Sequence, residues 1–225
     1  NYAYWSINSC ETFGFSNFYT AHEMIWNEDA IRAQEIYLDE FFGHKNAFSG
    51  KRMDESENVV IMGHRFSDFD SFGSAVGVYA IASHFGKRTN IVLNKKNSLA
   101  MPLVERFEAH YGNEIIVQPD RAAGLIGENT LLVVVDTHKQ NVTEMPELIG
   151  KTEKVMVIDH HRKSVGFIEN TVMFYHMPNS SSASEMVAEL VQYVDAKPVI
   201  NQFDALALFA GIMLDTRNFI IKQRR

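Results

Sequence analysis

The hydrophobic and polar positions of the chain follow two different patterns, with the change near residue 57. From residue 58 onward, short apolar runs rich in β-branched residues alternate with longer segments whose apolar residues recur every three or four positions. Several of the short runs show no polar alternation, which is typical of strands buried on both faces of a parallel sheet. These runs, each a candidate strand, are residues 59–62, 90–93, 114–117, 131–135, 155–158 and 172–175.

Helices are predicted between most of these strands. Gly86 provides a stop for the first helix, and Pro102 suits the first turn of the second. The alternation of strands and helices predicts an α/β fold, in which a mostly parallel sheet of about five strands is flanked by helices, in a domain covering residues 58–225. The four predicted helices are residues 72–85, 102–112, 184–194 and 203–213.

Residues 1–57 have a different composition. Residues 1–50 hold 12 of the 26 aromatic residues of the chain, and residues 51–58 are polar and charged, as in a linker. One amphipathic helix is predicted between a cap at Asn27 and a stop at Gly43. We therefore expect an N-terminal aromatic-rich helical segment and linker, to which the sequence assigns no function.

The composition excludes several classes of protein. The chain has 225 residues, of which 46% are hydrophobic, so it is long enough to bury a sizeable core. Its net charge of −7 disfavours binding to long nucleic acids, because cationic side chains supply most of that affinity. The single cysteine, Cys10, excludes an internal disulfide and a cysteine-rich zinc site, and it fits the reducing cytoplasm. No apolar run approaches the length of a membrane span, roughly eighteen residues, so we expect no membrane contact from this segment.

Acidic and histidine residues directly follow three of the predicted strands. In an open parallel sheet, ligands bind beyond the carboxyl ends of the strands, so these positions are the first place to look for a site. A further acidic residue follows the otherwise apolar helix that is predicted to end near residue 213. The residues concerned are His64, Asp68 and Asp70 after the first strand, Asp136 and His138 after the fourth, Asp159, His160 and His161 after the fifth, and Asp215 after the helix.

Several carboxylates share a small buried site only if a positive charge offsets them. A ligand set rich in oxygen, with a minority of imidazoles, suits Mn²⁺ or Mg²⁺ better than a metal that prefers sulfur. Two such ions bridged by one carboxylate, about 3.5–4 Å apart, form an arrangement used for in-line attack on phosphorus. One ion lowers the pKa of a bound water to make hydroxide, and both hold the phosphoryl oxygens.

Each of these residues taken alone has a simpler explanation. An Asp after a strand is most often a helix cap or a turn residue, and a lone His is more often a hydrogen-bonded loop residue than a metal ligand. The small-residue loop at 180–184 has two interpretations: an ordinary Ser cap, which we favour, or a row of backbone N–H groups for a phosphate. The ordered combination of four acidic motifs is what favours a metal site.

The four motifs resemble those of the DHH phosphoesterase superfamily, which includes RecJ-type exonucleases, small-oligonucleotide phosphatases and manganese inorganic pyrophosphatases. Their wording is closer to one branch, the GdpP-type cyclic-di-AMP phosphodiesterases, which have DTHK, DHHR and DTRNF at the last three motifs. The resemblance covers residues 58–222. The motifs are GHRFSDFDSFGSA at 63–75, VVVDTHK at 133–139, VIDHHRK at 157–163 and GIMLDTRNF at 211–219.

The resemblance implies a set of ligands for two Mn²⁺ ions, with Mg²⁺ or Co²⁺ as alternatives. One carboxylate is implied to bridge the ions, and the others are divided between them. The implied ligands are His64 and Asp68 for one ion, Asp70, His160 and Asp215 for the second, and Asp136 as the bridge.

The resemblance also implies roles for the residues around these ligands. His161 is expected to contact a phosphate oxygen or to assist the leaving alcohol, so His161 and Asp136 are the candidate catalytic residues. Asp159 is expected to orient His160 from behind. The further candidates are His138 as a donor lining the site, and Arg162 and Arg217 for contact with phosphate or for surface salt bridges.

The function implied by the resemblance is that of a manganese-dependent phosphodiesterase, which hydrolyses cyclic di-AMP to linear pApA by two-metal hydroxide attack on phosphorus. The same motifs serve a small-oligonucleotide (nanoRNA) exonuclease or pAp phosphatase and a manganese pyrophosphatase. A non-catalytic nucleotide- or metal-binding sensor is a further alternative. The expected partner is a small nucleotide, either a cyclic dinucleotide or a short oligonucleotide, and a homodimer is left open.

The chain departs from the family pattern in its extent. It begins with Asn1 rather than Met and ends at Arg225, before the C-terminal associated domain with which DHH enzymes grip the far end of the substrate. We therefore expect a piece of a longer protein, with weak or absent activity by itself. GdpP-type proteins have membrane helices upstream, so the resemblance leaves open a membrane-anchored parent with this domain facing the cytoplasm.

Overall fold

The computed structural model describes residues 55–192, 194 and 199–220. The N-terminal helix predicted between Asn27 and Gly43 lies outside the described residues, together with most of the predicted linker. The predicted α/β domain therefore holds nearly everything that the structure describes.

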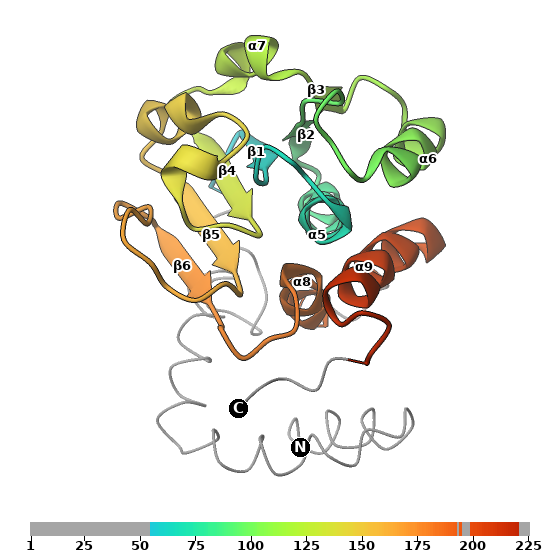
Figure 1. Ribbon diagram of the computed structural model, residues 1–225. Coiled ribbons are helices and arrows are strands. Elements are labelled where there is room, and N and C mark those ends of the chain that lie inside the picture. The colour runs from blue at the N-terminus through green and yellow to red at the C-terminus, as the bar shows by residue number, and fades with distance from the viewer. Residues whose placement is uncertain (1–54, 193, 195–198, 221–225) are drawn as a thin grey trace. The chain divides into compact units, whose positions relative to one another are not determined.

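Six strands form one sheet, and each neighbouring pair of strands is parallel (Figure 1). All six apolar runs identified in the sequence contribute a strand, so the sheet has one strand more than the expected five. The third run contributes only two residues, because its pairing with β2 is that short. The strands, in their order across the sheet, are β3 (Ile116–Val117), β2 (Arg88–Val92), β1 (Asn58–Met62), β4 (Thr130–Val135), β5 (Val155–Asp159) and β6 (Met173–His176).

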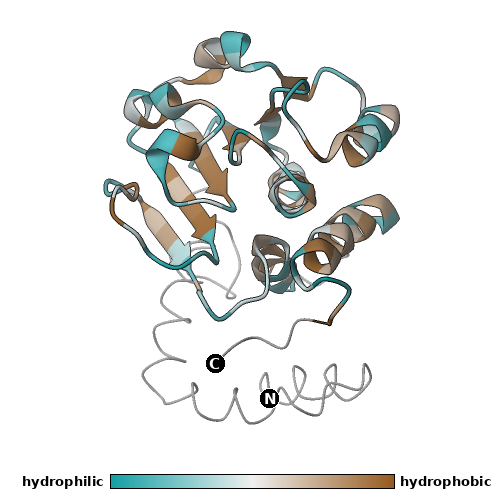
Figure 2. Cartoon of the chain, in the orientation of Figure 1, coloured by the Kyte–Doolittle hydropathy of each residue, from teal (hydrophilic) through white to brown (hydrophobic). Residues whose placement is uncertain are grey.

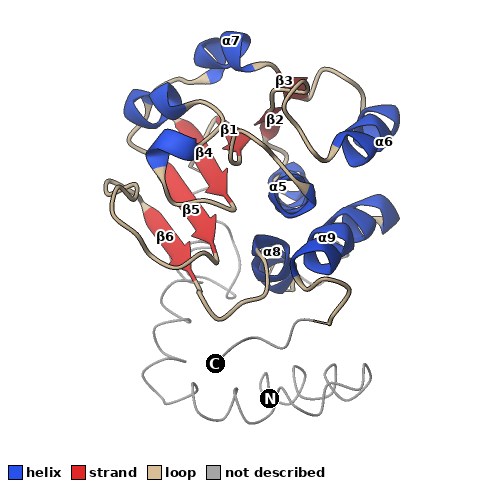
Figure 3. Cartoon of the chain, in the orientation of Figure 1, coloured by secondary structure: helices blue, strands red, loops and turns tan. Residues whose placement is uncertain are grey.

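The four predicted helices are confirmed, and shorter helices join them (Figure 3). The first begins three residues earlier than predicted because the Asp68 side chain caps it, accepting hydrogen bonds of 3.0 Å from the N–H groups of Asp70 and Ser71. No helix in the described part of the chain is both long and apolar enough to span a lipid bilayer. The α-helices are α5 (Phe69–His84), α6 (Met101–Tyr111), α7 (Pro119–Ala122), α8 (Ala183–Val191) and α9 (Gln202–Asp215), and the 3₁₀ helices are η1 (Ala123–Leu125), η2 (Gln140–Val142) and η3 (Pro146–Lys151).

Both faces of the sheet are covered, which explains why the strand sequences lack polar alternation. On one face, Val60 and Leu132 belong to a buried cluster with Ala122 of α7 and Leu148 of η3. On the other face, α5 packs on β1 and α8 packs on β5. Every residue of β1, β4 and β5 is buried, and Figure 2 shows these strands as mainly hydrophobic. The core thus holds the central strands on both sides and leaves their ends to the loops.

Glycines bring α5 and α9 into close contact. A Cβ atom added at Gly73 would lie 2.4 Å from the backbone oxygen of Ala207, and one added at Gly211 would lie 2.9 Å from the Cα of Asp70. The first turn of α5 therefore meets the last turns of α9. Since α5 starts where β1 ends, this packing brings Asp215, the last residue of α9, to the same edge of the sheet.

We predict that Gly73→Ala destabilises the domain by about 1–3 kcal/mol, because the added methyl group meets backbone that cannot move without separating α5 from α9. The measurement is unfolding in urea, monitored by circular dichroism. Gly124→Ala is the matched control, since a Cβ there has no heavy atom within 4 Å. Equal unfolding midpoints for Gly73→Ala and the control would contradict the close packing.

Candidate metal centre

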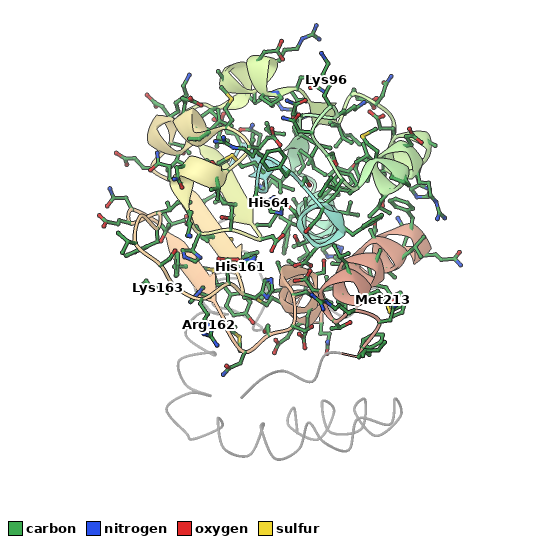
Figure 4. The ribbon with its side chains drawn as sticks, in the orientation of Figure 1. His64, Lys96, His161, Arg162, Lys163 and Met213 are labelled. Carbon is green, nitrogen blue, oxygen red and sulfur yellow. The ribbon has the colours of Figure 1, made fainter. Side chains whose placement is uncertain are left out.

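The candidate site lies at the carboxyl ends of β1, β4 and β5. The chain proceeds from β1 outward to β2 and β3, and then returns to β4 on the other side of β1. The connections that follow β1 and β4 therefore diverge, and open α/β sheets bind ligands at such a point. Figure 4 shows His64 and His161 at this edge.

His64 follows β1 and faces two carboxylates. Its Nε2 lies 3.3 Å from Oδ2 of Asp136 and 3.8 Å from Oδ1 of Asp68. The three side chains offer ligand atoms that all lie within 4.8 Å of one another. The structure thus brings together the residues expected to hold the first ion.

His160 lies on the other side of Asp136. Its Nε2 is 3.2 Å from Oδ2 of Asp215, 3.5 Å from Oδ1 of Asp136 and 3.7 Å from Oδ2 of Asp70. These are the residues expected to hold the second ion. We refer to the two imidazoles and the four carboxylates around them as the ligand cluster, which consists of His64, Asp68, Asp70, Asp136, His160 and Asp215.

Asp136 has the geometry expected of a bridge. One of its carboxylate oxygens faces His64 and the other faces His160. Its backbone has φ of 58°, in the left-handed region that Asp tolerates better than most residues, and its N–H donates to the carbonyl of Ile158 at 2.9 Å. This left-handed turn at the end of β4 places the carboxylate between the two imidazoles.

Asp70 is fixed by the start of α8. Its two carboxylate oxygens accept hydrogen bonds from the N–H groups of Ala183, at 2.7 Å, and Ser184, at 2.8 Å. These two N–H groups are therefore not available to a phosphate, which corrects that interpretation of the small-residue loop. The favoured interpretation is confirmed, since Ser182 caps α8 by accepting a hydrogen bond from the N–H of Glu185.

The cluster concentrates negative charge in a buried place. Burial favours the neutral imidazole at His64 and His160, but the carboxylates around each ring outweigh burial and raise the pKa of both rings to about 10. Burial, together with the charges of Asp136 and Asp215, raises the pKa of Asp70 to about 8, although hydrogen bonds from Ser184 oppose the shift. The site therefore attracts positive charge, which either protons or metal cations can supply.

Two atoms at the centre of the cluster are placed to contact a metal cation. Oδ1 of Asp136 and Nε2 of His160 are buried, and neither has a hydrogen-bond partner among the described residues. A buried polar atom without a partner costs about 1–3 kcal/mol, and a cation contacting both atoms would remove that cost. Carboxylates with a minority of imidazoles are ligands that Mn²⁺ and Mg²⁺ accept.

Asp159 does not orient His160 as predicted. Its carboxylate contacts His161 and His138 instead: Oδ1 lies 2.8 Å from Nδ1 of His161, and Oδ2 contacts Nδ1 of His138. The physical reason is the bend that follows β5, in which the Asp159 carboxylate also accepts a hydrogen bond of 3.3 Å from the backbone N–H of His161. Burial opposes ionisation of Asp159, but the two imidazoles outweigh it and hold the pKa of the carboxyl below its usual range.

His138 contacts Asp159, and two residues that sequence analysis did not select accompany it. His138 is buried, and its Nε2 lies 3.2 Å from the backbone nitrogen of Ser164. The Nε2 atom of His176 lies 2.6 Å from the carbonyl oxygen of His161. This contact follows from the parallel register, which pairs Asp159 with His176. Sequence analysis missed the contact because the register depends on strand order and not on the spacing of residues within one motif.

Arg162 and Arg217 are both exposed, and neither forms an ion pair within the ranges that the structure describes. Figure 4 shows Arg162 on the outer side of His161. The surface salt bridges considered for these residues are thus not formed in the described part, and contact with phosphate stays a prediction for both.

Comparison with known proteins decides the family. The family described as "DHH family, N-terminal domain" matches residues 58–212, which include five of the six residues in the ligand cluster. The chain belongs to the DHH family. It is 38% identical to the cyclic-di-AMP phosphodiesterase GdpP of Bacillus subtilis (strain 168) over 173 residues, which are 75% of this chain and 26% of that protein.

A further relative supports this assignment, and a solved structure shares the fold. The chain is 37% identical to the cyclic-di-AMP phosphodiesterase PdeA of Listeria monocytogenes serotype 1/2a (strain 10403S) over 172 residues, again 75% of this chain and 26% of that protein. It thus spans about a quarter of the length of these curated relatives. The fold is similar to that of an exopolyphosphatase-related protein from Bacteroides fragilis, with a TM-score of 0.65 and 23% identity over 78% of this chain and 51% of that one.

We predict that Asp136→Asn abolishes tight binding of two divalent cations, lowering the affinity for Mn²⁺ by more than about 100-fold, because one oxygen of the bridging position becomes an N–H donor. Isothermal titration calorimetry with Mn²⁺ measures the stoichiometry and the affinity. Asp120→Asn, which removes the same charge from the exposed surface of α7, is the control and should bind like the parent. Two tight Mn²⁺ ions in Asp136→Asn would contradict the assignment of the bridge.

Proposed function

We propose that this chain is the catalytic domain of a manganese-dependent phosphodiesterase that hydrolyses cyclic di-AMP to linear pApA. The observation that carries the proposal is the ligand cluster, in a domain that is 35–38% identical to cyclic-di-AMP phosphodiesterases. The relatives are several times longer than the chain, so the proposed activity belongs to the whole protein of which this domain is a part. We further propose that the domain acts in the cytoplasm, and that its partner is a small nucleotide.

The proposed reaction cleaves one P–O3′ bond of the cyclic dinucleotide. The hydroxyl group of a water molecule adds to phosphorus, and the remaining proton ends on the departing 3′ oxygen. Two Mn²⁺ ions held by the ligand cluster would offset the carboxylate charges, lower the pKa of a water and withdraw charge from the phosphoryl oxygens. The ligand cluster itself contributes fixed positions, since Asp68 and Asp70 are held by the hydrogen bonds that start α5 and α8.

His161 is the residue that we propose for the proton transfer to the leaving oxygen. Its side chain is 56% exposed, unlike the buried Asp136, so a substrate at the edge of the sheet can reach it. Its Nδ1 is engaged by Asp159 at 2.8 Å, which leaves Nε2 for the substrate. The Nδ1 atom is also only 3.6 Å from Oδ1 of Asp136, so the ring lies beside the ligand cluster. General acids placed in this way typically contribute 10²–10⁴-fold to rate.

The direct test is incubation of the full-length protein with cyclic di-AMP and Mn²⁺, followed by chromatography of the products. We expect pApA to form, and chelation of the metal to stop the reaction, because four closely spaced carboxylates without cations repel a phosphate. Failure to cleave cyclic di-AMP, with cleavage of pApA, short RNA or pyrophosphate, would replace the proposed substrate with one of those. Binding of nucleotide with no turnover of any phosphoester would favour a sensor.

We predict that His161→Ala and His160→Ala fail in different ways. His161→Ala should lower the turnover number by about 10²–10⁴-fold and still bind two Mn²⁺ ions, since its proposed role is proton transfer. His160→Ala should lose tight binding of the second ion and activity together. Turnover assays combined with calorimetry separate the two effects. Loss of one Mn²⁺ ion in His161→Ala would instead make His161 a ligand.

A further inference from the structure

A line of hydrogen-bonded side chains, two of them buried, supports His161 on its Nδ1 side. This line of side chains consists of Ser164, His138 and Asp159, of which Asp159 is fully buried and His138 is 1% exposed. None of the three belongs to the ligand cluster. Their contacts determine which ring nitrogen of each histidine carries a proton.

The protonation of His138 follows from its contact with Ser164. The backbone N–H of Ser164 can only donate, and it points at Nε2 of His138 over 3.2 Å. Nε2 must therefore carry a lone pair, so the proton of the neutral ring is on Nδ1. That Nδ1–H donates to Oδ2 of Asp159, which leaves Oδ1 of the same carboxylate for a second donor.

The second donor is His161. Oδ1 of Asp159 accepts from Nδ1 of His161 at 2.8 Å and from its backbone N–H at 3.3 Å. The Asp159 carboxylate cannot rotate toward solvent, because His138 holds its other oxygen. The ring of His161 is thus fixed with its Nδ1–H toward Asp159 and its Nε2 outward. The proton that His161 gives to the leaving oxygen is therefore a second one, carried on Nε2.

His176 on β6 fixes the backbone of His161. Its Nε2 lies 2.6 Å from the carbonyl oxygen of His161, and since a carbonyl only accepts, Nε2 carries a proton. His138 and His176 follow β4 and end β6, the two strands on either side of β5, and their rings are in edge contact at 5.4 Å. Residues from three adjacent strands therefore converge on His161. Asp159 contacts its ring, and His176 contacts its backbone carbonyl.

We propose that His138 is a positioning residue for His161, acting through Asp159, so that His161 presents Nε2 to the leaving oxygen of the substrate. The inference rests on the proposed function for its catalytic consequence, but the orientation of His161 is independent of it. A third metal site at His138, Asp159 and His176 is the competing explanation, because ligand atoms of these residues lie within 4.8 Å of one another. The contacts disfavour it, since Nδ1 of His138 and Nε2 of His176 both act as donors and have no lone pair for a metal.

Three substitutions of His138 in the full-length protein test the proposal. His138→Phe keeps the ring and removes the donor to Asp159. His138→Asn keeps an amide N–H near the position of Nδ1, whereas the longer His138→Gln places its amide near the position of Nε2. His84→Phe, at an exposed position on α5, is the control for exchanging His with Phe.

We expect His138→Phe to lower the turnover number for cyclic di-AMP by about 10–100-fold, with KM and the binding of two Mn²⁺ ions unchanged, as for residues that orient another group. His138→Asn should recover most of the lost rate, and His138→Gln should not. His84→Phe should have the rate of the parent. If His138→Phe does not fold, the comparison of His138→Asn with His138→Gln still decides the question, because both keep a polar side chain.

The second measurement does not need activity. Long-range ¹H–¹⁵N correlation spectra of the metal-free protein, recorded at a pH at which the ring is neutral, report which ring nitrogen of His161 carries the proton. We expect the Nδ1–H form in the parent and in His138→Asn, and a mixture of both forms in His138→Phe.

A parent that hydrolyses no phosphoester but shows these spectra would overturn the proposed function and leave the positioning role. A turnover number and a His161 spectrum unchanged in His138→Phe would overturn the positioning role. A loss of bound metal in that variant would favour the third metal site.

Discussion

The structure depends on one electrostatic constraint, which is that four aspartates share the end of a hydrophobic sheet with only two imidazoles between them. Such an arrangement is unfavourable unless positive charge enters it. The folded chain meets this constraint in part through hydrogen bonds, because Asp68 and Asp70 accept from the N–H groups that begin α5 and α8. The Oδ1 atom of Asp136 accepts no hydrogen bond from the described residues, so it marks a place where a cation would contribute.

The apolar layers determine where those charges lie. The central strands are buried on both faces, so only their ends are open to polar chemistry. The glycine contacts between α5 and α9 add a ligand that the sheet cannot supply, since Asp215 follows no strand and reaches the site only because Gly73 and Gly211 let the helices approach. The positions of the charges are thus set by packing at some distance from them.

Much of the fold and the ligand cluster could be predicted from the sequence, because both depend mainly on patterns among residues that are close together in the chain. Uninterrupted apolar runs indicate buried parallel strands, and each ligand stands directly after such a run or at the end of a helix. Contacts between neighbouring strands were harder to predict. Asp159 contacts His161 across the bend that follows β5 and His138 after the neighbouring strand β4, and His176 lies beside them through its register with Asp159. Neither fact is contained in a single motif, since both depend on which strands lie side by side.

The dual use of Asp70 has a consequence for how such a domain can change in evolution. Its carboxylate is one of the ligand cluster and at the same time the group that receives the first N–H groups of α8. A substitution at Asp136 or Asp215 removes charge from the site and leaves the helices in place, so it offers a route to a folded descendant without chemistry. A substitution at Asp70 removes a structural contact as well, and selection for folding alone would retain it. Inactive descendants of this domain should therefore lose their aspartates in a definite order, with Asp70 among the last.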